Sequence, residues 1–140
     1  MIKTANHTQA PLLLFAGLLS AALASCGGPA SAPVSPAVGT WTGHYTNGSV
    51  PVPTTGAINY AFLVRADGTM NVYNGPIGTG SVAHGTWVYE GGHFKGSYTY
   101  DGTSFTYSVD STLASPSRLA GTWGSGSNTT NGGNFGIDRQ

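Results

Sequence analysis

Residues 82–109 have the sequence VAHGTWVYEGGHFKGSYTYDGTSFTYSV, in which bulky apolar side chains recur at every second position. Such alternation is typical of β-strands that bury one face in a core. Two pairs of turn residues, Gly91-Gly92 and Asp101-Gly102, interrupt the alternation, and both pairs are strong signals for short hairpins. The stretch therefore predicts three consecutive antiparallel strands joined by tight turns.

The same pattern continues on both sides of this stretch. Asp67-Gly68, Asn74-Gly75 and Ser115-Pro116-Ser117 mark further turns, and no segment from Gly39 onward shows helical spacing of apolar residues over three turns. Eight strands are predicted. Their inward positions, strand by strand, are Trp41, Gly43 and Tyr45; Ile58, Tyr60, Phe62 and Val64; Met70 and Val72; Ala83, Gly85, Trp87 and Tyr89; Phe94, Tyr98 and Tyr100; Phe105, Tyr107 and Val109; Leu119, Gly121 and Trp123; and Phe135, Ile137 and Arg139.

Eight strands in sequence order predict an all-β fold, a single eight-stranded antiparallel up-and-down barrel. Closure is favoured because an open meander leaves two exposed edges, and the chain has few Lys residues to protect them. A barrel of this size has room for side chains or one small ligand. The alternative is a two-sheet β-sandwich, because alternation alone does not distinguish the two architectures.

Composition narrows the function classes. The chain has 140 residues, which suits one domain, and its five Lys/Arg balance five Asp/Glu. Only 7% of residues are charged and no basic run is present, so nucleic acid is not an expected partner. Hydrophobic residues make up 39%, which is enough for a core. The single cysteine cannot form an internal disulfide.

The N-terminal residues have the parts of an export signal. Lys3 precedes an apolar run from Leu12 to Ala24, which is shorter than the roughly 20 residues that span a bilayer as a helix. Leu23-Ala24-Ser25-Cys26 resembles the bacterial lipoprotein signal. The resemblance implies that a helical signal peptide is cleaved off, and that Cys26 becomes the first mature residue and carries diacylglycerol (with palmitate-type acyl chains) on its sulfur. The alternative is ordinary cleavage at Ala22-Leu23-Ala24, which leaves Cys26 a free thiol.

This interpretation divides the chain into three parts. Residues 1–25 are a lipoprotein signal peptide, 26–38 a lipidated, flexible tether rich in Pro, Gly and Ser, and 39–140 the barrel domain. Two or three acyl chains anchor a protein stably where one does not. The expected partner is therefore a membrane. Gly27 is not the Asp that the lipoprotein family associates with inner-membrane retention, so the resemblance implies the outer membrane of a bacterial envelope.

The tripeptide Gly-Thr-Trp occurs at 39–41, 85–87 and 121–123. Its unequal spacing argues against a solenoid, and we interpret each Gly as room for a Trp or as a point where a strand coils at a barrel corner. Gly39-Thr40-Trp41 is similar to the Gly-x-Trp signature of lipocalin and avidin-type barrels, the calycin group. That resemblance implies that Arg139 covers Trp41 in a cation–π contact. Trp41, Trp87, Trp123 and Arg139 are thus expected to be structural.

The sequence departs from that group in two ways. The later lipocalin signature blocks are not recognisable, and no biotin-contacting residues of avidins are matched. The chain also looks like small Gly/Thr-rich bacterial lipoproteins that contain a Gly-Thr-Trp-Gly-Ser-Gly segment, here residues 121–126, followed by a Gly-Gly-x-Phe strand, here 132–135.

No catalytic or metal-binding constellation is recognisable. His44, His84 and His93 are not at chelating spacing and lie opposite the aromatic faces, so they are expected to face solvent. Asp67 and Asp101 belong to hairpin turns. The remaining acids, Glu90, Asp110 and Asp138, are too scattered for an acid/base pair. We expect no cofactor, no metal and no enzymatic activity.

Two classes of function remain. In the first, the barrel binds a small hydrophobic or amphipathic ligand in a cleft that some inward aromatic residues leave open. The weak candidates for ligand contact are Tyr60, Trp87, Tyr89, Tyr98 and Tyr107. In the second, the long polar loops 47–56 or 124–134 bind a protein partner, as in a small periplasmic protease inhibitor. A purely structural surface lipoprotein, with its aromatic residues simply filling the barrel, is the remaining alternative.

Overall fold

The computed structural model of the chain describes residues 34–140. The predicted signal segment 1–25, the Cys26 attachment site and the tether up to residue 33 lie outside the described residues. Within the described part, no helix is long and apolar enough to cross a membrane.

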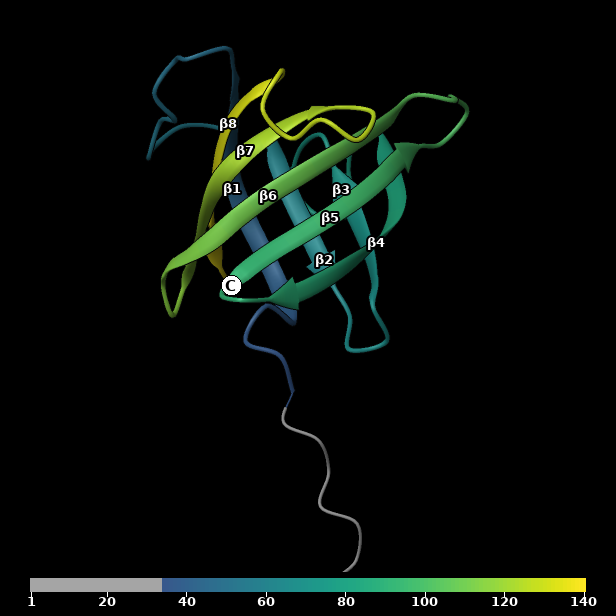
Figure 1. Ribbon diagram of the computed structural model, residues 1–140. Helices are drawn as coiled ribbons and strands as arrows, with labels where there is room; N and C mark the ends of the chain where they lie inside the picture. Colours follow the sequence, from purple (N-terminus) through teal and green to yellow (C-terminus); the bar gives the residue numbers. More distant parts are fainter. Residues whose placement is uncertain (1–33) are drawn as a thin grey trace, which may run out of the picture. The chain divides into compact units, whose positions relative to one another are not determined.

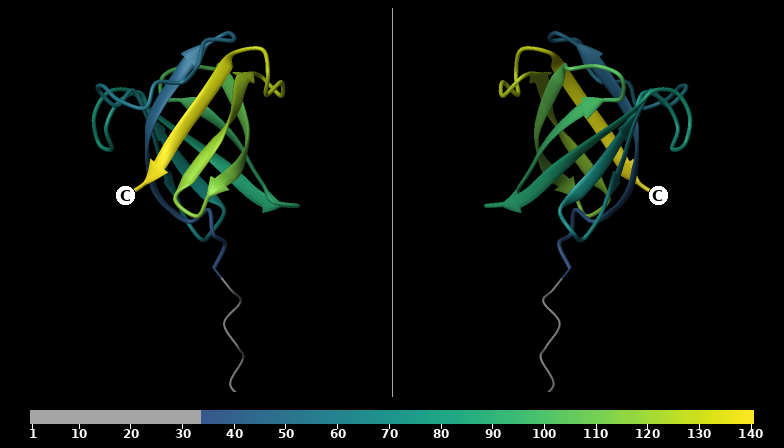
Figure 2. Two further views of the ribbon diagram at one scale, coloured as in Figure 1. Left: turned by 90° about the vertical axis from the view of Figure 1, so that its left-hand side faces the viewer. Right: turned by 90° about the vertical axis from the view of Figure 1, so that its right-hand side faces the viewer.

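Eight antiparallel strands form a closed barrel in sequence order (Figures 1 and 2). The prediction of an eight-stranded up-and-down barrel is confirmed, and the two-sheet alternative is set aside. The architecture is compatible with a calycin-like fold. The strands are β1 (Gly39–Asn47), β2 (Tyr60–Val64), β3 (Thr69–Tyr73), β4 (Val82–Glu90), β5 (His93–Tyr100), β6 (Thr106–Ser115), β7 (Arg118–Ser125) and β8 (Gly133–Arg139).

The barrel is closed by pairing between the first and last strands. β1 and β8 are antiparallel over seven residue pairs, from Trp41 opposite Arg139 to Asn47 opposite Gly133. This pairing leaves neither strand as a free edge, which is why a sheet with so few charged residues needs no other edge protection.

The two ends of the barrel differ. At one end β2–β3, β4–β5 and β6–β7 are joined by short turns, and the described chain also enters and leaves there. At the other end the connections are longer, namely residues 48–59, 74–81, 101–105 and 126–132 (Figure 1). We call these the closed end and the open end, because a cavity lined by inward-facing aromatic residues lies at the second.

The middle of the barrel is filled by the inward positions that alternation predicted. Phe62 lies at the centre, 5.6 Å from Phe135 and 6.1 Å from Phe94 between ring centroids. Gly96 leaves room for a neighbour, because a Cβ there would lie 2.8 Å from the sulfur of Met70. The other buried apolar residues of this layer are Val64, Val72, Ala83, Val109, Leu119 and Ile137.

Glycine permits close approach between strands at several places. A Cβ at Gly85 would lie 2.0 Å from the carbonyl oxygen of Ser97, and one at Gly121 would lie 2.1 Å from that of Asp110. These two Gly-Thr-Trp glycines therefore sit where strands coil tightly against each other, as predicted. Room for a Trp is provided instead by Gly132, whose Cβ would lie 2.4 Å from Trp123 Cε3.

Two predicted inward positions are wrong. Phe105 is 69% exposed because the turn after β5 extends through residue 105 and β6 begins at Thr106. Ile58 lies outside β2, which begins at Tyr60. The side chain of Asn59 takes the place of a strand residue there, since its Oδ1 accepts a hydrogen bond from the backbone N–H of Tyr45 at 2.9 Å.

The expectation that every domain histidine faces solvent is also wrong for one of the three. His84 and His93 are exposed, but His44 is only 8% exposed. His44 lies on the outer face of β1 opposite Gly136, where a Cβ would lie 3.6 Å from Val52 Cγ1. The Arg118 side chain lies closer still to that position, at 2.5 Å. Arg118 and Val52, from β7 and the loop after β1, therefore cover this part of the outer face, which strand alternation does not reveal.

Candidate functional site

The closed end is plugged by Trp41 and Arg139. The Arg139 guanidinium lies 4.3 Å from the Trp41 ring centroid, so the cation–π contact implied by the calycin resemblance is present. Arg139 also donates hydrogen bonds to the carbonyl oxygens of Val38, at 2.7 Å, and Pro36. The Trp41 indole donates to the carbonyl of Ala37 at 2.9 Å, and Ala37 is buried with it.

Trp87 closes the rest of this end. Its indole donates to the carbonyl oxygen of Arg65 at 2.9 Å, across the turn between β2 and β3, and its ring stacks on Phe94 at 5.7 Å. Tyr89 packs against the core as well. Both aromatic side chains therefore pack at the closed end and not around the cavity at the open end.

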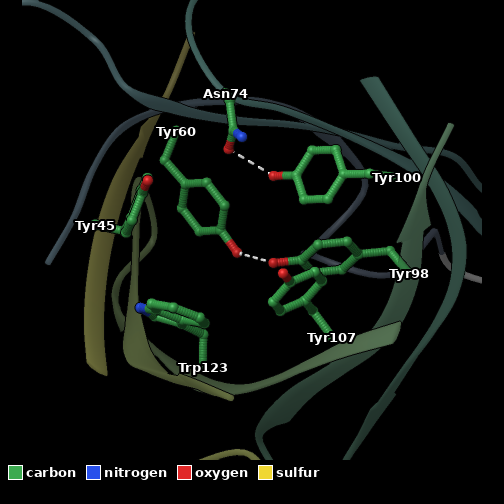
Figure 3. A pocket seen from close by; sticks show the side chains of 7 residues that line it. All are labelled: Tyr45, Tyr60, Asn74, Tyr98, Tyr100, Tyr107 and Trp123. Atoms are coloured by element: carbon green, nitrogen blue, oxygen red, sulfur yellow. Dashed lines mark hydrogen bonds between the residues drawn. The ribbon is translucent and has the colours of Figure 1, made fainter. Parts of the chain in front are cut away.

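A cavity of about 100 Å³ lies at the open end (Figure 3). We call it the tyrosine pocket. Its side chains come from five different strands and one loop, and the strand residues all lie near the strand ends that face the long connections. The lining residues are Tyr45, Tyr60, Asn74, Tyr98, Tyr100, Tyr107 and Trp123.

Five of these rings form a continuous circuit around the pocket. Tyr45 contacts Tyr60 at 5.2 Å and Trp123 at 5.6 Å between ring centroids, both edge to face. Trp123 contacts Tyr107 at 6.1 Å, and Tyr107 stacks on Tyr98 at 5.8 Å. A hydrogen bond of 2.6 Å between the hydroxyls of Tyr98 and Tyr60 completes the circuit (Figure 3). Since each ring is fixed by two neighbours, the walls are preorganised.

A second hydrogen bond lies beside the circuit. The Tyr100 hydroxyl donates to Asn74 Oδ1 at 2.6 Å and links β5 to the loop between β3 and β4. The indole N–H of Trp123 donates a hydrogen bond to the carbonyl oxygen of Thr46 at 3.0 Å. These bonds link the pocket residues to neighbouring segments and hold them in one arrangement.

Burial keeps three phenols of the pocket, those of Tyr60, Tyr98 and Tyr100, protonated. Desolvation raises the pKa of Tyr60 well above its ordinary value, and the hydrogen bond and nearby phenols of the cluster raise it further. Desolvation also raises the pKa values of Tyr98 and Tyr100, although the hydrogen bond with Tyr60 opposes the increase at Tyr98. The pocket therefore presents neutral hydroxyl groups at physiological pH.

The sequence found part of this site. Of the five candidates for ligand contact, Tyr60, Tyr98 and Tyr107 line the pocket, whereas Trp87 and Tyr89 lie elsewhere. Sequence reasoning missed four lining residues, which are Tyr45, Asn74, Tyr100 and Trp123. A signal for three of them was available. In an up-and-down barrel, the late positions of odd strands and the early positions of even strands share one end with the long loops. Tyr45, Tyr100 and Trp123 come late in β1, β5 and β7.

The other polar residues pair on the surface. His84 lies 3.3 Å from Asp101, His93 lies 2.8 Å from Asp110, and Arg118 lies 2.6 Å from Asp138. Within residues 34–140, no three His, Cys, Asp or Glu side chains gather as a metal site would require.

Asp67 has the turn role that was predicted. Its carboxylate accepts hydrogen bonds from the backbone N–H and hydroxyl of Thr69 at 2.9 and 2.7 Å, and these bonds lower its pKa. The carboxylate therefore stabilises the turn between β2 and β3.

Comparison with protein-family models, curated proteins and solved structures finds no match to this chain, so its function has to be argued from the barrel and its pocket.

Proposed function

We propose that this protein is a non-enzymatic binding module that holds one small amphipathic ligand in the tyrosine pocket. The observation that carries the proposal is the preorganised circuit of Tyr45, Tyr60, Tyr98, Tyr107 and Trp123 around an open cavity. Rings supply apolar contact, and the phenol and amide groups supply hydrogen bonds that orient a ligand, which is the usual composition of small-molecule sites.

The size of the pocket limits the ligand. Its volume of about 100 Å³ is below the range of roughly 300–1,000 Å³ that encloses drug-sized ligands. An apolar cavity of about 150 Å³ is known to hold benzene. A single six-membered ring or a compact branched group therefore suits the pocket, with the rest of the ligand outside, whereas a fully enclosed fatty-acid chain does not.

The lining chemistry favours binding over catalysis. The seven lining residues include no carboxylate, imidazole or amine that would act as an acid or base at neutral pH. The raised pKa values of Tyr60, Tyr98 and Tyr100 also make these phenols poor nucleophiles.

Calorimetric titration of the full-length chain with cyclohexanol, phenol and palmitate tests this proposal. We expect saturable one-site binding of the ring compounds and none of palmitate. Tyr107→Leu should weaken ring binding at least about fivefold, whereas the matched change Tyr89→Leu, in a half-buried tyrosine at the closed end, should leave it unchanged. Equal weakening by both variants, or no saturable binding, contradicts the proposal.

We further propose that the module is attached to a bacterial envelope, in the outer membrane, through lipid on Cys26. This rests on the Leu23-Ala24-Ser25-Cys26 sequence behind an apolar run. Labelling of producing cells with radioactive palmitate should mark the wild-type chain and not Cys26→Ala. Equal labelling of both chains contradicts the anchor without affecting the binding proposal.

Protein interaction through the open-end loops is the second candidate function. It is favoured by two exposed apolar side chains on those loops, Val50 at 57% and Phe105 at 69%. Cross-linking in intact cells should give a discrete adduct that the double change Val50→Ser/Phe105→Ser abolishes and Val88→Ser, an exposed valine on β4, retains. An adduct that survives the double change contradicts this candidate.

A further inference from the structure

The shape and chemistry of the tyrosine pocket select among amphipathic ligands. Tyr45 and Trp123 are seen edge-on in Figure 3, on two different sides of the cavity, with Tyr60 and Tyr107 on the others. Neighbouring rings in the circuit are 5.2–6.1 Å apart between centroids. Because Tyr45 and Trp123 are seen edge-on in Figure 3, their faces turn toward the cavity between them. A compact group inside the circuit therefore lies against these faces, which carry the negative part of the ring quadrupole and attract a cation.

The charges around the pocket agree with a cationic group of low hydration. No Lys, Arg or His lines the cavity, so nothing there repels a cation or pairs with an anion. No carboxylate lines it either, and the phenols remain neutral, so a cation is attracted by aromatic faces alone. That attraction is largest when the cation loses little hydration on entry, as a methylated ammonium does.

The hydrogen bonds of the pocket argue against a primary ammonium. Such a group carries three N–H donors that need acceptors. The hydroxyls of Tyr60 and Tyr98 are engaged with each other, and the Tyr100 hydroxyl and Asn74 Oδ1 are engaged with each other. A primary ammonium would have to direct its three donors at the few phenol oxygens of the pocket, some of them already engaged, whereas a trimethylammonium has no N–H to satisfy and needs only aromatic contact.

Resting on the proposed function, we infer that the tyrosine pocket is an aromatic cage for a quaternary ammonium group of the choline type. The trimethylammonium occupies the cavity and the remainder of the ligand extends past Asn74 toward the long loops. Free choline and the headgroup of a choline lipid both carry this trimethylammonium group, so either could supply it.

Comparison of choline with its uncharged isostere, 3,3-dimethylbutan-1-ol, isolates the charge, because the two have the same shape. Calorimetry on the full-length chain should give choline at least about tenfold higher affinity. Equal affinities, or binding of the isostere alone, overturn the cage while leaving the proposed function intact. If neither compound binds and cyclohexanol and phenol also fail, the proposed function fails as well.

Substitutions at Tyr45 identify the interaction. Tyr45 has no side-chain hydrogen bond that the cage requires, so Tyr45→Phe should keep the preference for choline. Tyr45→Leu should reduce choline affinity about three- to tenfold more than it reduces the affinity of the isostere. Tyr89→Leu should change neither. An equal loss in Tyr45→Phe and Tyr45→Leu overturns the cage, and the comparison of the two ligands on the wild-type chain stands even if Tyr45→Leu fails to fold.

The source of the choline group is decided with vesicles. Full-length Cys26→Ala, which cannot be acylated at that position, is mixed with phosphatidylcholine or phosphatidylglycerol vesicles and separated by flotation. Flotation with phosphatidylcholine that free choline reverses supports the cage and assigns a lipid headgroup. Choline binding without flotation supports the cage and assigns a free ligand. Equal flotation with both lipids together with no calorimetric preference for choline overturns it.

Discussion

At the scale of single residues, the three Gly-Thr-Trp tryptophans share one role. Each indole donates its N–H to a backbone carbonyl outside its own strand, Trp41 to Ala37, Trp87 to Arg65 and Trp123 to Thr46. Their inward direction could be predicted from alternation. The acceptors of Trp87 and Trp123 could not, because Arg65 and Thr46 are distant in sequence and tertiary packing alone brings them close. The acceptor of Trp41 is local, since Ala37 lies only four residues earlier in the chain.

Arg139 should stabilise the barrel through Trp41 and the carbonyls of Pro36 and Val38. Arg139→Met removes the charged hydrogen bonds and the cation–π contact, so the free energy of unfolding should fall by about 2–3 kcal/mol in a denaturant titration. The control Arg118→Met removes a surface pair with Asp138 and should cost less than about 1 kcal/mol. Equal losses in the two variants would show that Arg139 does not hold the closed end.

Removal of the Ser111 hydroxyl, unlike the loss of the Arg139 side chain, should not destabilise the barrel. Its Oγ is buried and has no hydrogen-bond partner within residues 34–140. Ser111→Ala removes an unsatisfied group, so the free energy of unfolding should stay constant or rise by about 1 kcal/mol. Ser108→Ala breaks a 2.6 Å hydrogen bond to the carbonyl of Gly126 and should lower it by about 1 kcal/mol. A clear loss in Ser111→Ala would mean that its hydroxyl is bonded in solution.

At the scale of elements, the strands and tight hairpins could be predicted and the loop contacts could not. Asp67-Gly68 and Gly91-Gly92 mark turns through local backbone chemistry, which any short window of sequence contains. The exposure of Phe105 and the burial of His44 depend on where loops end and what they cover. Neither property has a periodic signal.

Gly85 allows strand β4 to pack closely against strand β5. A Cβ there would collide with the Ser97 carbonyl on β5, and backbone cannot move aside without separating the two strands. Gly85→Ala should therefore lower the free energy of unfolding by about 3 kcal/mol. Gly91→Ala places a side chain at φ +59° in open space and should cost only about 1 kcal/mol. Similar costs at the two sites would contradict tight coiling of β4 against β5.

At the scale of the whole molecule, the asymmetry of the two ends creates the site. Short turns and the Trp41 and Trp87 contacts fill the closed end, and long loops leave the other end open. Alternation predicted that Tyr60, Tyr98 and Tyr107 face inward, but it did not show which inward side chains line a pocket and which fill the core. Combining strand direction with loop length would have placed them together with Tyr45 and excluded Tyr89.

Alkaline pH should unfold the barrel through its buried phenols. Their pKa values are raised above the ordinary 10.0, so the folded state keeps protons that the unfolded chain loses. The free energy of unfolding should not depend on these groups below about pH 10 and should fall as pH rises above it. Tyrosinate absorbance and circular dichroism, followed together, should show the last phenols ionising with unfolding. Ionisation of all seven tyrosines near pH 10 in a folded chain would contradict burial.

The most direct test of the binding site is ¹⁹F NMR of the full-length chain labelled with 3-fluorotyrosine, titrated with choline and with 3,3-dimethylbutan-1-ol. Five of the seven tyrosines line the pocket, whereas Tyr73 and Tyr89 do not. We expect the resonances of five tyrosines to shift with a single dissociation constant, namely Tyr45, Tyr60, Tyr98, Tyr100 and Tyr107, while those of Tyr73 and Tyr89 stay fixed. Shifts confined to Tyr73 or Tyr89, or no shift with either compound, would contradict it.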